Sequence, residues 1–269
     1  MNKRKMIVLY IMIGLIFIEC LYALWENTHF TLTEYEYTNA RIPTEMDGLR
    51  ILQISDLHNQ SYGRDNKRLL RAIRNADAHV IVITGDLVDS TFTDTEEALS
   101  FAEALVQIAP VYYCTGNHEH RLPPKDLRAF LQGLSQRGVR VLSNEAIPFY
   151  GGTLVGLKDP DSQKHTLRRI LRNEESDSFT LLLSHKPHHI ENYQEADLVL
   201  AGHAHGGQAR LPLIGGIIAP GQGYFPKYTE GFYTMGNTTM LVSRGIGNSH
   251  RLPRFFNMPE LVLLTLRSQ

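Results

Sequence analysis

The stretch from Leu49 to His58 reads LRILQISDLH, and it joins an apolar run to a cluster of metal-binding residue types. The run through Ile54 is rich in β-branched and other apolar residues, which is typical of a strand buried on both faces of a sheet. Asp56 and His58 follow directly where this run ends. In open α/β sheets, ligands bind beyond the carboxyl ends of the strands. The stretch therefore predicts an α/β protein with functional side chains at that edge.

Four further apolar runs, at 80–83, 110–114, 179–183 and 197–200, have the same arrangement. Segments with the apolar spacing of helices separate them, at 66–76, 95–108 and 125–137. The polar residues that follow the four runs are Gly85-Asp86 with Asp89, Gly116-Asn117-His118-Glu119, His185, and Gly202-His203-Ala204-His205. Each group alone is commonly found in turns or, for a single histidine, in a protein core, without any ligand-binding role. Five groups in series predict that these side chains meet at one edge of the sheet.

Seven of these side chains form a ligand set of imidazoles, carboxylates and one amide oxygen, without a thiolate. This mixture suits borderline divalent ions such as Mn, Fe, Zn, Co or Ni, and it is richer in nitrogen than calcium sites. Seven ligands exceed the four of a structural zinc site, whereas two ions about 3.5–4 Å apart with a bridging carboxylate account for the number. The predicted metal ligands are Asp56, His58, Asp86, Asn117, His185, His203 and His205.

The motifs D-x-H, G-D-x-x-D, G-N-H-E, a single histidine and G-H-x-H occur in this order between residues 54 and 208. Together they resemble the calcineurin-like metallophosphoesterase superfamily. The resemblance implies a four-layer α/β/β/α sandwich, whereas the apolar pattern alone predicts a simpler doubly wound sheet. Segments 47–59, 243–247 and 254–262 are similar to a membrane-anchored or exported bacterial branch, some of whose members hydrolyse UDP-2,3-diacylglucosamine.

The resemblance also implies a role for each residue. The ligands of the first metal would be Asp56, His58, Asp86 and His205. Those of the second would be Asp86, Asn117, His185 and His203, so that Asp86 bridges the two ions. His118 corresponds to the catalytic histidine and Asp89 to the carboxylate that hydrogen-bonds and orients it, while Asn117 and His118 contact substrate. A metal-bridging hydroxide would attack phosphorus, and His118 would protonate the leaving oxygen.

Three functions remain open from the sequence. The first is a dinuclear metal-dependent phosphoesterase acting on a phosphate mono- or diester. The second is a pyrophosphatase acting on a lipid-linked nucleotide sugar such as UDP-2,3-diacylglucosamine, which an exposed apolar groove beside the site would favour. The third is a metal-dependent scaffold, which His118 and Asp89 argue against because a scaffold needs no acid. Arg244 and Arg254 either contact substrate phosphate or form ordinary surface pairs.

The first 26 residues differ from the rest of the chain. Lys3-Arg4-Lys5 precede a run from Met6 to Trp25 whose only charged residue is Glu19, and about 20 residues suffice to span a bilayer. We predict an uncleaved signal-anchor over residues 1–26 and a catalytic domain over 27–269. A cleaved signal peptide and a buried helix of the domain are the alternatives. The basic start predicts a single-pass cell-membrane protein with its catalytic domain on the extracytoplasmic side.

Composition disfavours several other classes of protein. The formal net charge of -1 gives no sign of a nucleic-acid-binding surface, and two cysteines are too few for a disulfide framework. Neither a P-loop nor a G-x-S-x-G motif occurs, which disfavours a nucleotide-driven motor or a serine hydrolase. No segment indicates a protein partner. The predicted partners are a phosphoester substrate and, through the N-terminal segment, the membrane.

Overall fold

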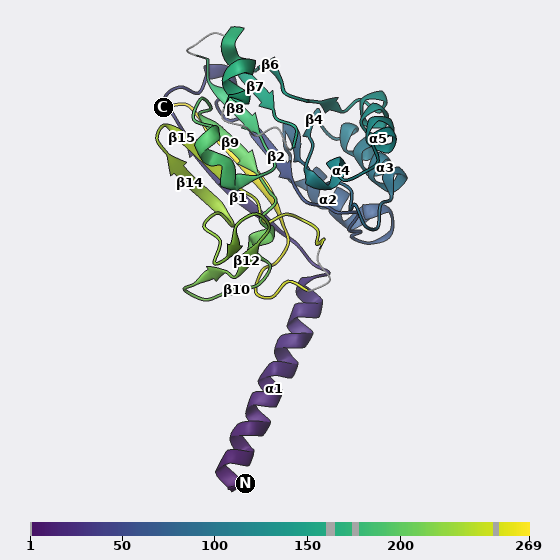
Figure 1. Cartoon of the computed structure of the whole chain (residues 1–269), viewed down its shortest axis with the longest axis vertical. Helices are drawn as coiled ribbons and strands as arrows, with labels where there is room; N and C mark the ends of the chain where they lie inside the picture. Colours follow the sequence, from purple (N-terminus) through teal and green to yellow (C-terminus); the bar gives the residue numbers. More distant parts are fainter. Residues whose placement is uncertain (1, 160–164, 174–177, 250–252) are drawn as a thin grey trace.

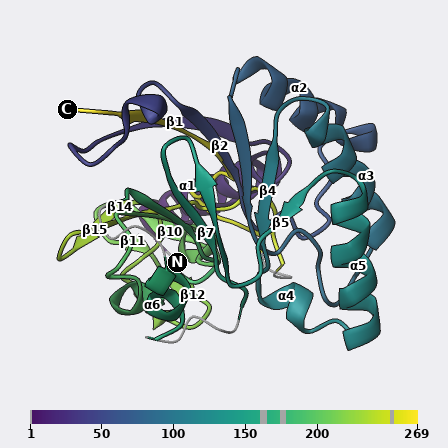
Figure 2. The ribbon, with the colours of Figure 1, turned by 90° about the horizontal axis from the view of Figure 1, so that it is seen from above.

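The structure is a computed structural model that describes residues 2–159, 165–173, 178–249 and 253–269 of the 269-residue chain. Two six-stranded sheets face each other, helices cover their outer faces, and one long helix extends away from this body (Figure 1, Figure 2). The predicted four-layer α/β/β/α fold is confirmed. The doubly wound single sheet that the apolar pattern alone predicts is wrong.

The first sheet has the strand order β1-β16-β2-β3-β4-β5. Its strands are β1 (Thr31–Thr38), β2 (Arg50–Ile54), β3 (Val80–Thr84), β4 (Val111–Cys114), β5 (Arg140–Val141) and β16 (Glu260–Arg267). β2 to β5 run parallel, so their carboxyl ends lie at one edge. β16 lies between β1 and β2, parallel to the first and antiparallel to the second.

The second sheet has the order β14-β15-β9-β8-β7-β6. Its strands are β6 (Glu145–Phe149), β7 (Gly152–Gly156), β8 (Thr180–Leu183), β9 (Leu198–Ala201), β14 (Gly231–Met235) and β15 (Thr238–Val242). β7, β8, β9 and β15 run parallel. The five strands that carry the motifs are therefore divided between two sheets, and the prediction that they share the edge of one sheet is wrong. Their carboxyl ends meet across the interface between the sheets, where Gln53 Nε2 of β2 donates to the Ala201 carbonyl of β9 at 2.9 Å.

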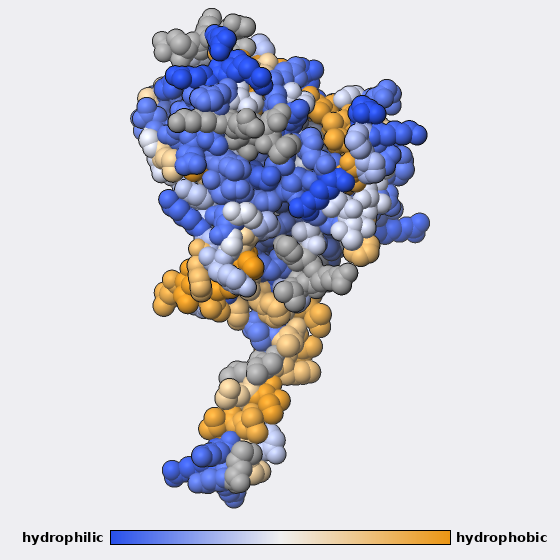
Figure 3. All heavy atoms as spheres, viewed as in Figure 1, coloured by the Kyte–Doolittle hydropathy of each residue, from blue (hydrophilic) through white to orange (hydrophobic). Residues whose placement is uncertain are grey.

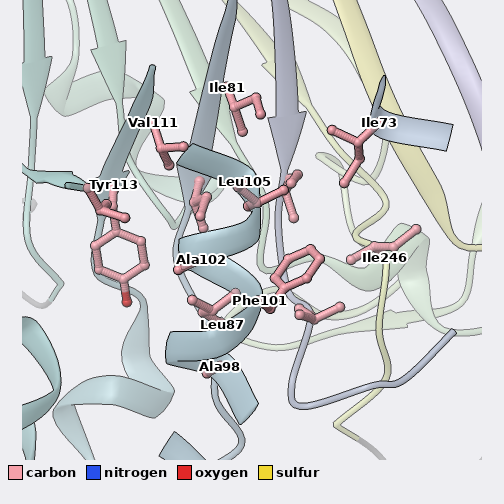
Figure 4. Close-up of a cluster of buried hydrophobic side chains, with 14 of the residues drawn as sticks. Ile73, Ile81, Leu87, Ala98, Phe101, Ala102, Leu105, Val111, Tyr113 and Ile246 are labelled. Carbon is pink, nitrogen blue, oxygen red and sulfur yellow. The ribbon is translucent and has the colours of Figure 1, made fainter. Parts of the chain in front are cut away.

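Alternate side chains of one strand enter different hydrophobic cores, because successive side chains of a strand point to opposite faces. In β3, Ile81 and Ile83 pack against the helices, whereas Val80 and Val82 pack against the second sheet. The helices over the first sheet are α2 (Lys67–Asn75), α3 (Thr95–Val106) and α5 (Pro124–Gln136). Figure 4 shows Ile81 in this core with Leu105 of α3. These fully buried β-branched runs are the reason that the strands were recognisable in the sequence.

The outer face of the second sheet packs against shorter helical segments. Leu182 of β8 and Val199 of β9 share a core with residues of α6 (Thr166–Ile170) and η4 (Pro187–Asn192). Two small hairpins follow β9, and they pair β10 (Arg210–Leu211) with β11 (Gly215–Gly216) and β12 (Ile218–Ala219) with β13 (Gly223–Tyr224). The hairpins lie at the end of the body from which the long helix leaves (Figure 1).

Helix α1 (Lys3–Glu26) is a candidate membrane span by length and composition. Only 6% of its apolar window is buried, so the alternative of a buried helix of the domain is wrong. Its last turn is nevertheless joined to the body. Asn27 Nδ2 donates to the Arg254 carbonyl, and Arg254 N donates to Asn27 Oδ1, both at 2.9 Å. Because β1 follows only a few residues later, no long linker separates the helix from the body.

Candidate metal centre

The structure brings all seven predicted metal ligands together where the carboxyl ends of the two sheets meet. There are three groups of residues whose ligand atoms, within each group, all lie within 4.8 Å of one another: Asp56 with His58 and His205, His58 with Asp86 and His118, and Asp86 with His185 and His203. The seventh residue, Asn117, places its Oδ1 atom 3.2 Å from His185 Nε2. All seven are buried except the half-buried Asn117.

Asp86 lies at the centre of this cluster. Its Oδ2 atom is 3.6 Å from His58 Nε2 and 3.1 Å from His185 Nε2. Its Oδ1 atom accepts a hydrogen bond from the backbone N–H of His118 at 2.8 Å, which fixes the orientation of the carboxylate. One carboxylate oxygen of Asp86 therefore lies between histidines of the two outer groups.

The two outer groups direct ring nitrogens toward common points. On one side, His58 Nε2 and His205 Nε2 are 3.2 Å apart, and His205 Nε2 is 3.6 Å from Asp56 Oδ1. On the other side, His203 Nδ1 is 3.0 Å from His185 Nε2. His185 Nδ1 lies 2.8 Å from the Thr84 carbonyl and must donate to it. This contact fixes the ring so that Nε2 is the nitrogen free for a metal.

This donor set fits divalent metal ions. Buried nitrogens and carboxylate oxygens crowd together without a thiolate or a lysine among them. His58 Nδ1 is buried and has no hydrogen-bond partner in the described part of the chain; the closest carboxylate oxygen, Asp89 Oδ2, is 3.6 Å away. A cluster of this composition suits borderline ions better than Ca²⁺ or Mg²⁺.

Burial and neighbouring charges shift the pKa values of the cluster in opposite directions. Burial lowers the pKa of His58 to about 3 and raises the pKa of Asp56 to about 6. Burial also opposes charge on His185, yet the adjacent Asp86 carboxylate raises the pKa of His185 to about 10. Coordination through His185 Nε2 therefore requires loss of the proton that Asp86 stabilises, because a histidine binds metal in its neutral form.

Five of the seven ligands have a left-handed backbone conformation. Such φ values are uncommon outside glycine and cost on the order of 1–3 kcal/mol each. The conformation turns the chain sharply at the strand ends and directs the side chains back toward a common point. The φ values are 55° for Asp56, 49° for His58, 51° for Asp86, 68° for His203 and 47° for His205.

Two glycines allow the backbones of the motifs to approach the carboxylates. A Cβ atom on Gly116 would lie 2.2 Å from Asp86 Oδ1, and one on Gly202 would lie 2.4 Å from Asp56 Oδ2. Both distances are shorter than any non-bonded contact permits. The glycines of the G-N-H-E and G-H-x-H motifs are therefore required by the packing of this centre, beyond any role in turn formation.

His118 lies at the rim of the centre, on the single turn α4 (Asn117–His120). Its Nδ1 atom accepts a hydrogen bond from the Ser90 backbone N–H at 3.0 Å and lies 3.5 Å from Asp89 Oδ2. The carboxylate thus contacts His118 at ion-pair distance, while Asp89 Oδ1 accepts from the backbone N–H groups that follow it. The resemblance implied a direct hydrogen bond between Asp89 and His118; in the structure the carboxylate lies at ion-pair distance, and Ser90 makes the hydrogen bond to His118 Nδ1.

Arg121 is a site residue that the sequence analysis missed. Its Nη1 atom lies 3.0 Å from His118 Nε2, and its side chain is exposed. Burial lowers the pKa of His118; the carboxylates of Asp86 and Asp89 oppose this effect, and the Arg121 guanidinium adds to it. Arg121 belongs to no motif, and only its position three residues after His118 on the same turn could have indicated it.

Glu119 also has a role that its place in the G-N-H-E motif did not reveal. It is fully buried, and its carboxylate accepts four backbone hydrogen bonds from the two loops that carry Asp86 and His118. The donors are the N–H groups of Asp86 at 3.0 Å, Leu87 at 2.7 Å, Val88 at 3.3 Å and Gly116 at 2.7 Å. Burial and Asp86 raise the pKa of Glu119 to about 7, whereas these N–H donors favour its ionised form.

We expect Glu119→Gln to lower the free energy of unfolding by about 3 kcal/mol, because an amide NH₂ group would face buried N–H donors in place of an acceptor. Denaturant titration of the full-length protein in mild detergent measures this difference. The matched control is Glu103→Gln, at a side chain that is 61% exposed and 3.5 Å from Arg137, and it should change stability by less than about 0.5 kcal/mol. Equal midpoints for the two variants would contradict the assignment.

The segment after residue 250 contributes two more residues to the centre. Asn257 Nδ2 donates to the carbonyls of His205 at 2.7 Å and Gln208 at 3.1 Å. Arg254 is fully buried, with Nη2 at 3.3 Å from His205 Nδ1 and 2.6 Å from the Gly247 carbonyl. The alternative that Arg254 forms an ordinary surface pair is therefore wrong. Arg244 does form ion pairs, with Glu260 at 2.8 Å and Glu230 at 3.4 Å.

Comparisons with known proteins agree with this geometry. The sequence profile of the calcineurin-like phosphoesterase family matches residues 49–207, more than half of the chain. The metallophosphoesterase YkuE of Bacillus subtilis is 31% identical over 253 residues, which cover 88% of this chain and 85% of YkuE. The phosphodiesterase YaeI of Escherichia coli is 29% identical over 205 residues, covering 70% of each chain.

Among solved structures, TT1561 of Thermus thermophilus is similar at 12% identity and a TM-score of 0.49, over 75% of this chain and 90% of that chain. The family assignment rests on the profile and on YkuE, which extend over most of the segment that carries the ligand cluster. It supports an enzyme over a scaffold without turnover. The chain belongs to the calcineurin-like phosphoesterase family and is a metal-dependent phosphoester hydrolase.

Proposed function

We propose that the protein hydrolyses a phosphate mono- or diester at a centre of two divalent metal ions. The observation that carries this proposal is the position of Asp86 Oδ2 between His58 Nε2 and His185 Nε2. Two such ions activate water and neutralise the charge that builds on a phosphoryl group. Asp56, His58, Asp86 and His205 would hold one ion, and Asp86, Asn117, His185 and His203 would hold the other.

His118 is proposed as the acid that protonates the leaving oxygen. It belongs to one cluster with Asp86, and Asp89 Oδ2 at 3.5 Å from its Nδ1 atom favours the protonated ring. Asn117 precedes it on the same turn, so that both side chains can contact one phosphoryl group. In the protonated form Asp89 positions the ring, and His118 delivers the proton.

We further propose that residues 1–26 are an uncleaved anchor and that residues 27–269 form the catalytic domain on the extracytoplasmic side of the cell membrane. Three basic residues precede the apolar part of α1, which favours a cytoplasmic N-terminus. The burial of Ala23 and Glu26 beside the hydrogen bonds of Asn27 with Arg254 supports an anchor that is retained. Removal of α1 would leave the body without the buried last turn of the helix that packs beside this contact.

A lipid-linked nucleotide sugar such as UDP-2,3-diacylglucosamine is a second candidate substrate, cleaved at its pyrophosphate. The supporting observation is an apolar groove of about 520 Å³ that begins five residues after His205 in the chain. Leu213, Ile214 and Phe256 line it. A small polar phosphoester would gain nothing from this surface, whereas an acyl chain would bury apolar area there.

Removal of metal should abolish turnover. We expect the full-length protein in mild detergent to lose hydrolysis of p-nitrophenyl phosphate and of bis(p-nitrophenyl) phosphate after chelation, because no described side chain can replace two cations in activating water. At least one of Mn, Fe, Zn, Co and Ni, added back singly, should restore it, and the preferred ester would identify a mono- or diesterase. Unchanged turnover in protein shown by elemental analysis to be free of metal would exclude the proposal.

A further inference from the structure

The two hairpins that follow the metal-binding loop form, together with Phe256 from the segment before β16, a surface of exposed apolar side chains, which we name the hairpin surface. Its residues are Leu213, Ile214, Ile218, Tyr224, Phe225 and Phe256. Leu213 is fully exposed, and Phe225 and Tyr224 are 68% and 75% exposed. Single exposed apolar residues are normal in soluble proteins, but a contiguous group marks a surface that something covers. In Figure 3, apolar side chains gather at the end of the body from which α1 leaves.

The hairpin surface continues directly into α1. The ring of Phe256 lies 6.2 Å from the ring of Tyr22 in the last two turns of the helix. Ala23 and Glu26 are buried against the body, and Asn27 is hydrogen-bonded to Arg254, two residues before Phe256. The end of α1 is therefore fixed relative to the hairpins, and the two cannot move apart as they could on a flexible linker.

The length of α1 places the hairpin surface at a defined depth. At 1.5 Å per residue, its 24 residues extend about 36 Å, and the hydrocarbon core of a bilayer is about 30 Å thick. A spanning α1 therefore has Tyr22 and Trp25 in the interfacial layer, where such aromatic residues are enriched. Because Tyr22 contacts Phe256, and Phe256 lines one groove with Leu213 and Ile214, the β10–β11 hairpin lies at the same level.

We infer that the hairpin surface is seated in the interfacial layer of the bilayer that α1 spans, so that lipid covers it. This inference rests on the proposed anchor role of α1. Lipid is favoured over a protein partner because the surface continues the membrane-facing end of the helix. Its composition of Leu, Ile, Phe and Tyr suits the boundary between acyl chains and headgroups. Lys227, two residues after Phe225, adds a cation at the level of the phosphate groups.

Membrane seating of the hairpins would also place the metal centre at the bilayer surface. The hairpins pack on the loop of His205, where the Ile217 N–H donates to the carbonyls of Gly207 at 3.1 Å and Ala209 at 2.8 Å. Asn257, which holds the His205 carbonyl, adjoins Phe256 in the chain. The centre would therefore take phosphoesters presented at the membrane surface more readily than esters dissolved in water.

Depth-dependent quenching tests the seating without any assay of activity. The full-length protein with Cys20→Ser keeps only the buried Cys114, so a cysteine introduced as Leu213→Cys or Phe225→Cys can be labelled with an environment-sensitive fluorophore. The protein is reconstituted into vesicles of phosphatidylcholine and phosphatidylglycerol, with or without acyl chains brominated near the headgroup. Trp25, the only tryptophan of the chain, reports the position of α1 in the same vesicles.

We expect bromolipid to quench both hairpin labels at least as strongly as Trp25. A label at Tyr150→Cys is the matched control. Tyr150 is exposed on the turn from β6 to β7, at the edge of the sheet opposite the metal centre. The label at this position should not be quenched. Quenching of Trp25 with hairpin labels no more quenched than Tyr150 overturns the inference while leaving the anchor intact. An unquenched Trp25 overturns both. Because Leu213 and Phe225 lie on different hairpins, either label suffices if the other variant folds poorly.

Discussion

Asp86→Asn is expected to remove nearly all turnover. Changes in residues that only hydrogen-bond a metal ligand lower activity by roughly 10–100-fold, and we expect a larger loss in kcat/KM here. Asp86 is the one ligand shared by both proposed ions, and it is 1% exposed. Asparagine has nearly the same shape and can still accept the His118 N–H with one oxygen. It lacks the negative charge and the second oxygen, so the fold is retained while a bridge between two cations is lost.

Steady-state rates and the metal content of the purified variant measure this effect together. The control is Asp65→Asn, which removes a carboxylate that is 69% exposed and forms surface contacts with Arg64 and Lys67. It should retain the activity and the metal of the unmodified protein, since surface ion pairs contribute little. An Asp86→Asn variant with a full complement of two ions and undiminished turnover would refute the bridging role.

His118→Ala is expected to lower kcat by about 10²–10⁴-fold for substrates with an alkyl alcohol as leaving group, which is the range of general acid catalysis. The deficit should be much smaller for p-nitrophenyl esters, because p-nitrophenolate departs without a proton. Metal content should remain unchanged, since His118 is proposed to act on the leaving oxygen and holds neither ion.

The dependence on leaving group separates this role from a structural one. A variant that only distorts the site would lose the same factor for every ester. His165→Ala is the control, because the His165 side chain is exposed and the residue accepts the Arg169 N–H through its backbone carbonyl, which alanine keeps. If the His118→Ala deficit is the same for alkyl and p-nitrophenyl esters, or if the variant loses metal, His118 is not the acid.

Apolar runs in the sequence identified most of the strands that carry the site, but they could not show which strands lie next to each other in a sheet. Val80–Thr84 and Leu198–Ala201 are both continuous apolar runs, because each is buried on two faces. Such a run contains no information about which sheet it joins. The partner of each strand depends on contacts between distant segments, such as Gln53 with Ala201, and these are encoded in no local pattern. The resemblance to a known family was needed to predict two sheets.

The candidate ligands were predictable for a different reason. Only a few residue types bind metal ions, and in this sequence each candidate ligand lies in the segment that follows a recognisable strand, as His58 does after β2. Residues that support the ligands follow no such rule. Asn257 reaches the His205 carbonyl from 52 positions away, and Arg254 reaches the ring of the same histidine from 49. The left-handed φ of Asp86 was equally hidden, because a strained backbone is set by surrounding packing and not by the residue itself.

The insertion of β16 between β1 and β2 has a consequence for biosynthesis. The ribosome makes β1 and β2 long before β16, and among the described strands β1 pairs only with β16. The edges of β1 and β2 that face β16 therefore stay open until β16 has been made, and open edges invite pairing with other chains. A premature stop codon before Glu260, the first residue of β16, would leave a product with this gap permanently exposed.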